Sequence, residues 1–304
     1  MLNILFITFY IKKNRVDIVK KYLKNKVNLF IVENSEDFVK YKKIDFDFIL
    51  TLYYWEMKWT KYIDNRDFIK IPDYINYKHI IYQDSNPLSS LVNNKKDILN
   101  IYRYSIDNLE ISKQRNIVNK TILKKLKKIN TKIQPYKNYD KDLSILILLQ
   151  NYYNHFINMS FEEYEIFIQN IINEIRMYSS NNIILRYKII KNDNDDRNKK
   201  INVSDPLNNL IITGENPLID DINKSYVAIA HSTNAVLRTI IEGVHIISLS
   251  KYCLCDNYAD HDISLIEKPN NYNRSELLKK IIACSWNYSD FESGLFIKYL
   301  EENI

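Results

Sequence analysis

The residues best placed to do chemistry are small polar side chains that follow an apolar run in the second half of the chain. Residues 226–230 are all apolar, and His231, Ser232, Thr233 and Asn234 come directly after them, before a helical pattern. Serine, threonine and asparagine cap helix N-termini, and the backbone N–H groups of a first helical turn favour anions, phosphate above all. The turn therefore predicts a phosphate site, although an ordinary strand, turn and capped helix would show the same pattern.

Glycine usage narrows the kinds of phosphate site that are possible. The chain has three glycines in 304 residues, where average usage would give about 21. Neither the dinucleotide fingerprint G-x-G-x-x-G nor the phosphate loop G-x-x-x-x-G-K-[ST] can be written with so few. Classical NAD-dependent Rossmann enzymes, P-loop NTPases and protein kinases are therefore disfavoured. Gly243, placed between a helical pattern and an apolar run, indicates a helix end that needs a left-handed backbone.

Other polar patterns do not indicate a metal or a disulfide. Five histidines show no paired metal-ligand spacing; they are His79, His155, His231, His245 and His261. Three cysteines, an odd and sparse set, predict free thiols in a reducing compartment; they are Cys253, Cys255 and Cys284. The acidic run 193–196 lacks the glycine and closing glutamate of a calcium loop and is interpreted as a solvated surface loop.

The N-terminal segment indicates a buried strand and not a signal peptide. Residues 1–10 lack a basic region and a small-residue cleavage site. No run reaches the roughly 18 apolar residues that a membrane helix needs. We therefore expect a cytoplasmic protein without a transmembrane segment.

Two series of apolar runs that alternate with helical patterns organise the chain. The expected strands are 3–10, 27–32, 46–52, 79–84, 144–149, 182–186, 210–212, 226–230 and 246–249. The expected helices are 15–25, much of 88–129, 160–178 and about 233–242. Strands that are apolar throughout and separated by helices predict parallel sheets covered on both faces. The expected fold class is α/β, with two Rossmann-like lobes, residues 1–135 and 136–304, and a ligand cleft between them.

Six pieces of sequence, in order, carry a resemblance to a known family. They are Arg115 before a helix, Ile133–Tyr136, Leu146–Gln150, Ile183–Lys188, His231–Ile247, and the closing set Asp262–Pro269, Arg274 and Ala283–Gly294. Across residues 115–304 the chain resembles a group of phage and bacterial glycosyltransferases of the GT-B type, related to capsule-type sugar transferases. The resemblance implies that the C-terminal lobe binds a nucleotide-sugar donor, with no further cofactor, and that the N-terminal lobe carries the acceptor site.

The resemblance also implies which residues contact the donor. The implied set is Gln150, Arg186, Lys188, His231, Ser232, Thr233 and Asn234. Two positions depart from the family pattern: Lys188 replaces a histidine, and Arg238 stands where many relatives carry an acidic ribose partner. The departure at Arg238 leaves open a catalytically inactive nucleotide-sugar-binding protein on the same fold.

Sugar transfer to a hydroxyl needs a base for that hydroxyl and positive charge for the departing diphosphate. Arg186 and Lys188 are the candidate catalytic cations. Asp84 is the candidate base because it follows an expected strand and so could face the cleft. An aspartate before Ser85-Asn86-Pro87 is also typical of an ordinary turn, so both interpretations stay open.

Basic residues concentrate in one segment. Residues 115–132 carry seven Lys or Arg residues, no Asp or Glu, and apolar residues at helical spacing, and the whole chain has a net charge of +6. This basic amphipathic helix could face DNA phosphates or an anionic membrane, or it could be a solvated lysine face. The resemblance implies a hydroxyl acceptor such as a surface glycan, the basic helix and net charge favour a hydroxymethylated DNA base, and a nucleic-acid-binding protein is an alternative.

The end of the chain predicts one more helix. Between residues 287 and 300 five aromatic or apolar residues recur close to helical spacing; they are Tyr288, Phe291, Leu295, Phe296 and Tyr299. The resemblance implies that this helix crosses back onto the N-terminal lobe, and we expect it to pack against residues before 130. A plain helix on its own lobe is the alternative.

Overall fold

A computed structural model describes residues 1–8, 13–52, 71–84, 102–107, 132–150, 152, 157, 159–187, 200–286 and 288–302. The chain divides into two compact units. The first unit comprises residues 1–58, 66–127 and 279–304, and the second comprises residues 59–65 and 128–278. Among the helices of the described ranges, none combines the length and apolar character needed to span a membrane.

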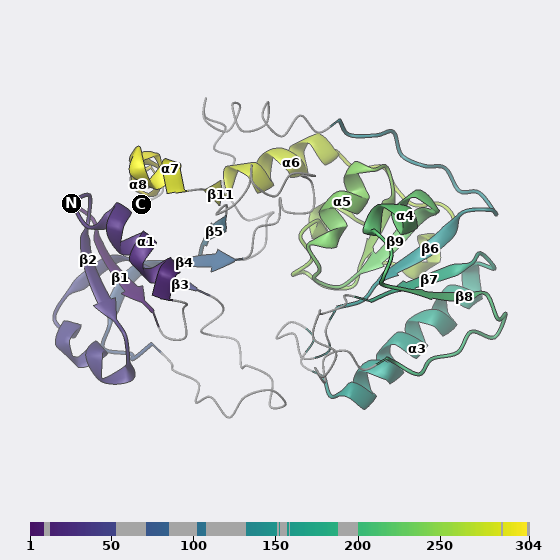
Figure 1. The fold of residues 1–304 in the computed structure, drawn as a ribbon, viewed down its shortest axis with the longest axis horizontal. Helices are drawn as coiled ribbons and strands as arrows, with labels where there is room; N and C mark the ends of the chain where they lie inside the picture. The colour runs from purple at the N-terminus through teal and green to yellow at the C-terminus, as the bar shows by residue number, and fades with distance from the viewer. Residues whose placement is uncertain are drawn as a thin grey trace. The chain divides into compact units, whose positions relative to one another are not determined.

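The first unit is built on a mixed sheet with the strand order β11-β5-β4-β3-β1-β2 (Figure 1). Its strands are β1 (Asn3–Ile7), β2 (Asn28–Val32), β3 (Asp45–Leu52), β4 (Asn76–Asp84), β5 (Tyr102–Ile106) and β11 (Ser285–Trp286). Its helices are α1 (Lys13–Leu23), η1 (Ser35–Tyr41), α7 (Tyr288–Glu292) and α8 (Leu295–Glu301). Strands β2, β1, β3 and β4 are parallel, as their apolar runs predicted.

A strand, β5, corrects the expectation of helices over much of 88–129 at residues 102–106, and the structure describes only residues 102–107 of that range. β5 lies in that segment and pairs antiparallel with β4, and β11 pairs antiparallel with β5. Tyr104 of β5 is fully buried, and the aromatic and β-branched residues of this strand favour a pleated, half-buried surface. Asp107, with φ 56°, turns the chain at the end of β5, and its side chain accepts a hydrogen bond of 2.8 Å from the Ile80 N–H.

The last residues of the chain complete the core of the first unit. The Phe291 and Phe296 rings lie 5.3 and 5.0 Å from the Tyr104 ring. Lys26 donates hydrogen bonds to the carbonyl oxygens of Phe291 and Glu292. The closing segment therefore packs on residues numbered well below 130.

One helix was expected over 287–300, and the structure has two. Gly294, with φ 77°, separates α7 from α8. A left-handed residue cannot continue an α-helix, which is why the segment divides at this glycine.

The second unit is built on a five-stranded parallel sheet with the order β10-β9-β6-β7-β8. Its strands are β6 (Ser144–Leu148), β7 (Ile183–Arg186), β8 (Leu210–Thr213), β9 (Ser225–Ala230) and β10 (His245–Ser248). Its helices are α3 (Phe161–Tyr178), α4 (Leu218–Asn223), α5 (Ala235–Ile241), η6 (Asp256–Tyr258) and η7 (Ile263–Leu265). Helix α6 (Arg274–Ala283) contains the boundary between the units. The α/β fold class with two Rossmann-like units is confirmed.

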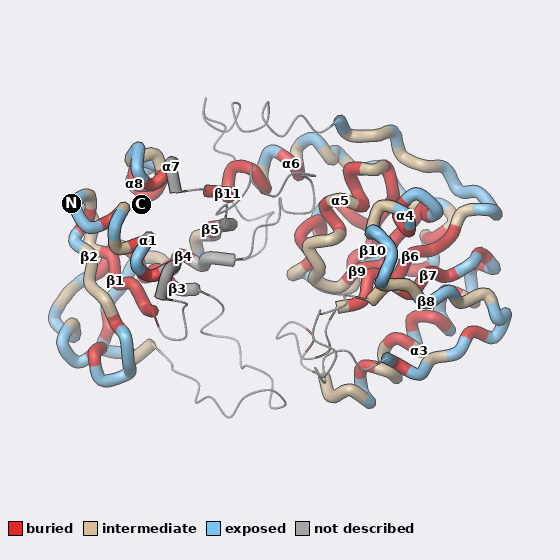
Figure 2. Tube along the Cα trace, in the orientation of Figure 1, coloured by how far each residue is buried: buried red, intermediate tan, exposed pale blue. Residues whose placement is uncertain are grey.

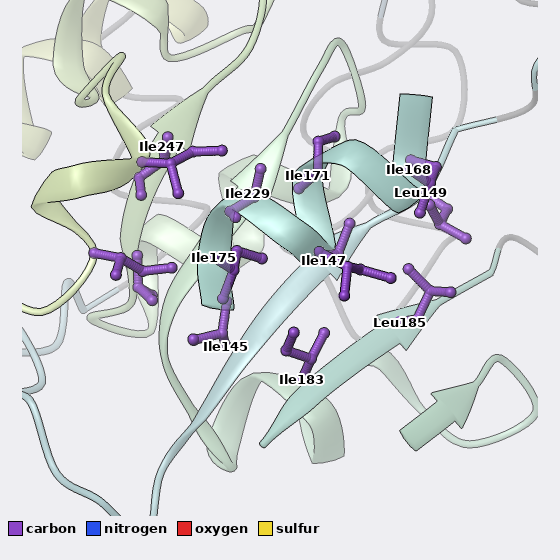
Figure 3. Packing of buried hydrophobic residues seen from close by; sticks show 14 of the residues in the cluster. Ile145, Ile147, Leu149, Ile168, Ile171, Ile175, Ile183, Leu185, Ile229 and Ile247 are labelled. Atoms are coloured by element: carbon purple, nitrogen blue, oxygen red, sulfur yellow. The ribbon is translucent and has the colours of Figure 1, made fainter. Parts of the chain in front are cut away.

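Aliphatic packing holds α3 on this sheet. Figure 3 shows Ile168, Ile171 and Ile175 of α3 above Ile145 and Ile147 of β6. Figure 2 shows the same strands as buried segments in the middle of the unit. The helix begins at the capping box that the sequence predicted: the Ser160 N–H donates to Glu163 Oε2 at 2.7 Å, and the Glu163 N–H donates to Ser160 Oγ at 3.1 Å.

Gly243 lies against the segment that leads into β6 of the second unit. The Gln134 N–H donates to the Ile241 carbonyl at 2.8 Å, and the Lys137 N–H donates to the Gly243 carbonyl at 2.7 Å. Gly243 has φ 82°, and a Cβ built on it would overlap the carbonyl oxygen of Pro135. The position needs glycine for two reasons, its left-handed backbone and the close approach of another segment.

Gly243→Ala should therefore lower the free energy of unfolding by about 2–5 kcal/mol, because it adds a left-handed strain of about 1–2 kcal/mol to an overlap with backbone atoms. Gly294→Ala is the matched control: its φ is 77°, but nothing lies within 4 Å of the added Cβ. That variant should lose only the strain of about 1–2 kcal/mol. Urea unfolding of both variants measures the difference, and equal losses would contradict the role given to Pro135.

Candidate functional site

Strand register brings several of the predicted site residues to one edge of the second unit's sheet. Leu148 of β6 pairs with Arg186 of β7 on one side and with Ala230 of β9 on the other. The three strands therefore end level. Gln150 follows β6 and His231 follows β9, so both lie with Arg186 at the carboxyl edge, where ligands of parallel α/β sheets bind.

Gln150 and Ser232 join two of these strand ends. The Ser232 N–H donates to Gln150 Oε1 at 3.2 Å, and the Ser232 Oγ lies 2.7 Å from the same oxygen. The Gln150 N–H donates to the Tyr164 hydroxyl oxygen at 3.2 Å, which ties this loop to α3. Hydrogen bonds between neutral groups thus join the ends of β6 and β9 and the helix α3.

These contacts determine the tautomer of His231. A backbone N–H can only donate, so the Gln150 atom that faces Ser232 is the carbonyl oxygen, and the Ser232 hydroxyl must donate to it. His231 Nδ1 lies 3.2 Å from Ser232 Oγ. Because the Ser232 proton is already used, Nδ1 carries a proton and donates it, and Nε2 keeps its lone pair as an acceptor.

Burial keeps this imidazole neutral. It lowers the pKa of His231 from 6.5 to about 4. The ring is half-buried, with the Phe167 ring edge-on at 6.4 Å. Neutral His231 therefore suits a hydroxyl or N–H donor of a ligand, and it adds no positive charge for phosphate.

The start of α5 differs in detail from the predicted cap. Asn234 is the N-cap residue but makes no capping hydrogen bond with its side chain. Thr233 Oγ1 instead accepts a hydrogen bond of 3.3 Å from the Ala235 N–H. Ser232, Thr233 and Asn234 thus all lie where the sequence places them, between β9 and α5, while donor binding by them stays a prediction.

Arg186 reaches the carboxyl edge but is engaged in the protein. Its guanidinium forms an ion pair with Asp221 and donates a hydrogen bond of 2.8 Å to the Asn216 carbonyl. Asp221 also accepts a hydrogen bond of 2.8 Å from Thr213 Oγ1. The side chains of Arg186 and Asp221 are only 13% and 3% exposed, so this buried pair ties β7 to α4. A role of Arg186 on a diphosphate stays a prediction, and it would have to share a charge that Asp221 already compensates.

The sequence did not indicate Asp221, since Asp220-Asp221 resembles the solvated first turn of a short acidic helix. β8 pairs with β7, and α4, which follows β8, then places Asp221 against Arg186. Arg238 is likewise paired, with Glu242 at 2.7 Å. Of the described residues, both arginines considered for donor recognition are therefore compensated by carboxylates.

Several other residues singled out in the sequence lie wholly or partly outside the described residues. Lys188 and the segments 115–131 and 193–196 lie outside the described residues, as does His155. Asp84 is the last residue of β4, at the carboxyl end of that strand, and its side chain lies outside the described part. The three cysteines form no disulfide. Within the ranges that the structure describes, no group of three or more His, Cys, Asp or Glu residues could hold a metal ion.

We expect long-range ¹H–¹⁵N correlation spectra to show His231 as the Nδ1–H tautomer, because Ser232 Oγ must accept its proton. With a pKa of about 4, the ring should stay neutral from pH 8 to about pH 5. Since the unfolded ring takes up its proton near pH 6.5, the free energy of unfolding should fall as the pH falls from about 6.5 to 4, by up to about 3 kcal/mol.

Two variants serve as controls for this prediction. Ser232→Ala removes the acceptor and should allow the Nε2–H tautomer, whereas His231→Gln should remove its share of the pH dependence of stability. An Nε2–H ring in the unchanged protein would contradict the hydrogen-bond assignment.

Arg186→Ala should lower the free energy of unfolding by about 3–5 kcal/mol, because it leaves the buried Asp221 carboxylate without its cation. Adding Asp221→Asn to the same chain should restore most of the loss, since the unpaired charge is then gone. Urea unfolding of the single and double variants measures both effects. An Arg186→Ala protein as stable as the unchanged chain would show that the pair has no structural role.

The fold is shared with a solved sugar transferase. KpsC from Thermosulfurimonas dismutans, a beta Kdo 2,7 transferase, aligns over 92% of this chain and 90% of its own, with a TM-score of 0.53 and 11% sequence identity. At this identity the similarity shows the fold alone, which is a distant glycosyltransferase-like fold.

Two dehydrogenases also align, with scores too low to carry an argument. D-2-hydroxyisocaproate dehydrogenase covers 97% of this chain and 97% of its own at a TM-score of 0.21. D-lactate dehydrogenase from Aquifex aeolicus, complexed with NAD and lactic acid, covers 99% of this chain and 97% of its own at 0.24; both are 11% identical. No protein family and no curated protein matches the sequence.

Proposed function

We propose that this protein transfers a sugar from a nucleotide-sugar donor to a hydroxyl group of an acceptor. The observation that carries the proposal is the fold, which follows that of a sugar transferase over 92% of the chain. The phage and bacterial GT-B resemblance of residues 115–304 supports the same activity from the sequence.

The second unit would bind the donor at the carboxyl edge of its sheet. The turn Ser232–Asn234 leads into α5, whose first N–H groups and dipole favour a phosphate. His231, neutral and with Nε2 as an acceptor, would receive a hydrogen bond from a hydroxyl or amine of the nucleotide or sugar. Gln150 would act through Ser232, because its amide oxygen holds that residue in place.

The first unit would bind the acceptor, either a surface glycan or a hydroxymethylated DNA base. Asp84 would take the proton of the attacking hydroxyl, since it ends β4 at the carboxyl edge of that sheet. Lys188, which follows β7 closely in the chain, would stabilise the departing phosphate together with Arg186.

Donor binding without turnover is a second candidate function. Arg238 stands where many members of the resembling family carry an acidic ribose partner, and here it is held by Glu242 at 2.7 Å. Glu242 would then contact the ribose in place of the acidic residue that position 238 lacks. An inactive protein that only binds the donor would carry the same turn at Ser232–Asn234.

A thermal-shift screen against UDP-, GDP-, CMP- and TDP-sugars tests donor binding, and release of the nucleotide in the presence of acceptor tests turnover. At least one nucleotide-sugar should raise the melting temperature. Stabilisation with turnover supports the transferase, and stabilisation without turnover supports the binding protein. A chain that no nucleotide-sugar stabilises would contradict both.

Asn234→Asp should weaken binding of the donor found in this screen by about 10- to 150-fold, because it places a carboxylate against the phosphates. Asn273→Asp is the matched control. The side-chain oxygen of Asn273 accepts a hydrogen bond from the Glu276 N–H at the start of α6. The next residue, Arg274, donates a hydrogen bond to the Ile240 carbonyl, near the end of α5 that lies opposite Asn234. Calorimetry should show unchanged affinity in the control, and unchanged affinity in both variants would mean that the phosphates bind elsewhere.

A further inference from the structure

In the described part of the chain, the two edges of the second unit's sheet differ in the backbone hydrogen bonds that they make. At one edge, Asp260 forms a bridge with Ile247 of β10. The Ser248 N–H donates to the Asp260 carbonyl at 2.7 Å, and the Asp260 N–H donates to the Ile246 carbonyl at 3.0 Å. At the other edge, β8 pairs with β7 and stands last in the strand order (Figure 1).

Hydrogen bonds show which groups of β8 face outward. The carbonyl oxygens of Asn209 and Thr213 accept hydrogen bonds from Ile183 and Tyr187, so these residues face β7. Because backbone groups alternate in direction along a strand, Leu210 and Ile212 turn their N–H and C=O groups to the open edge. Such a row of groups is a template for another strand.

The side chains of β8 are uncovered on both faces of the sheet. Ile211 is 47% exposed and Ile212 is 51% exposed, and successive side chains of a strand point to opposite faces. Their register partners on β7, Ile184 and Leu185, are buried. A helix could cover one face of β8, but a further strand extends both faces at once.

More exposed apolar side chains lie at the same corner of the unit. Arg176, near the end of α3, pairs with Asp205 at 2.6 Å and so holds the turn that leads into β8. Leu207 in that turn is 47% exposed, and Met177, beside Arg176, is 73% exposed. Leu207 thus adds a further exposed apolar side chain in the turn that leads into the open edge.

Charge favours a second copy of this chain as the occupant. Two copies with a net charge of +6 each repel one another overall, and an uncharged strand adds no further repulsion where two identical strands lie side by side. Residues 206–214 contain no charged side chain, in a chain of which 26% is charged. Two charged residues flank this stretch: Asp205, which is paired with Arg176, and Glu215, which lies beyond the end of β8.

We propose that β8 pairs antiparallel with β8 of a second copy, so that the two five-stranded sheets become one continuous sheet. In the two-fold register centred on Ile211, Leu210 of each copy exchanges both backbone hydrogen bonds with Ile212 of the other. The two Ile211 residues then face each other as a non-hydrogen-bonded pair, with Cα atoms about 4.5 Å apart.

Charge exchange at Ile211 tests this register. Ile211→Lys and Ile211→Glu each place like charges opposite one another, so each variant alone should dissociate at least about tenfold more readily than the unchanged chain. A mixture of the two should associate again, because lysine then faces glutamate. Sedimentation velocity of the full chain across a micromolar concentration series measures all of these species.

Two further variants keep the test decisive. Ile166→Lys, at a residue of α3 that is 62% exposed, should leave association unchanged. Ile212→Pro removes one outward N–H without removing a bond to β7, and it should weaken association even where a charged variant fails to fold. Thermal melts show which variants are folded.

A chain that stays monomeric throughout the series overturns the proposal and leaves the edge to a strand of another protein. Folded Ile211→Lys that associates as tightly as the unchanged chain also overturns it, since the contact then lies elsewhere. Failure of the folded Lys and Glu variants to associate when mixed overturns the register centred on Ile211.

Discussion

The candidate site depends on the position of β6 at the centre of the second unit's sheet. Leu148 is in register with Arg186 on one side and with Ala230 on the other. A slip of one residue in either pairing would turn every side chain of the moved strand to the opposite face. The aliphatic side chains that pack α3 on β6 and β7 oppose such a slip, because it would replace the side chains fitted against α3 by those of the other buried face. Burial far from the edge thus determines which polar residues meet at it.

The polar groups at this edge mostly satisfy one another. Arg186 is paired with Asp221, Arg238 with Glu242, and Gln150 with Ser232. Among the described residues, the edge therefore offers a ligand an imidazole acceptor and the start of a short helix. A site of this kind recognises a polar ligand by the direction of hydrogen bonds, whereas a site of unpaired cations recognises it by charge. The Ser232 hydroxyl donates to Gln150 Oε1 and accepts from Nδ1 of His231. Nε2 of His231 therefore keeps its lone pair for a ligand.

In the first unit, aromatic residues from distant parts of the sequence meet in one core. Trp286, Phe291 and Phe296 come from the end of the chain and pack in one core with Tyr104 and the first strands. These contacts join residues far apart in sequence, so the loop-closure cost of forming this core is high, and the core is complete only when both ends of the chain are present. The short strand β11 continues the same arrangement into the sheet, since it pairs with β5.

Local patterns were sufficient for the parts of the fold that depend on burial alone. Uninterrupted aliphatic runs predicted all five strands of the second unit's sheet, the capping box at Ser160 predicted the start of α3, and the place of Gly243 predicted its left-handed backbone. The carboxyl-edge positions of Gln150, Arg186 and His231 follow from the same runs, because parallel strands present their ends together. The sequence also carried the resemblance to glycosyltransferases, whose fold the chain shares.

Tertiary structure alone decided how those residues are used. β5 has no uninterrupted aliphatic run, and its place in the sheet is given by its pairing with β4 and β11. The charge of Arg186 is compensated by Asp221, which lies 35 residues further along the chain, and the tautomer of His231 depends on Gln150, 81 residues before it (231 − 150). Hydrogen bonds and ion pairs join groups that are distant in sequence, and their energies depend on burial that no local pattern encodes. The sequence therefore determined where the polar residues lie, and the packing of the chain determined their charge and their hydrogen bonds.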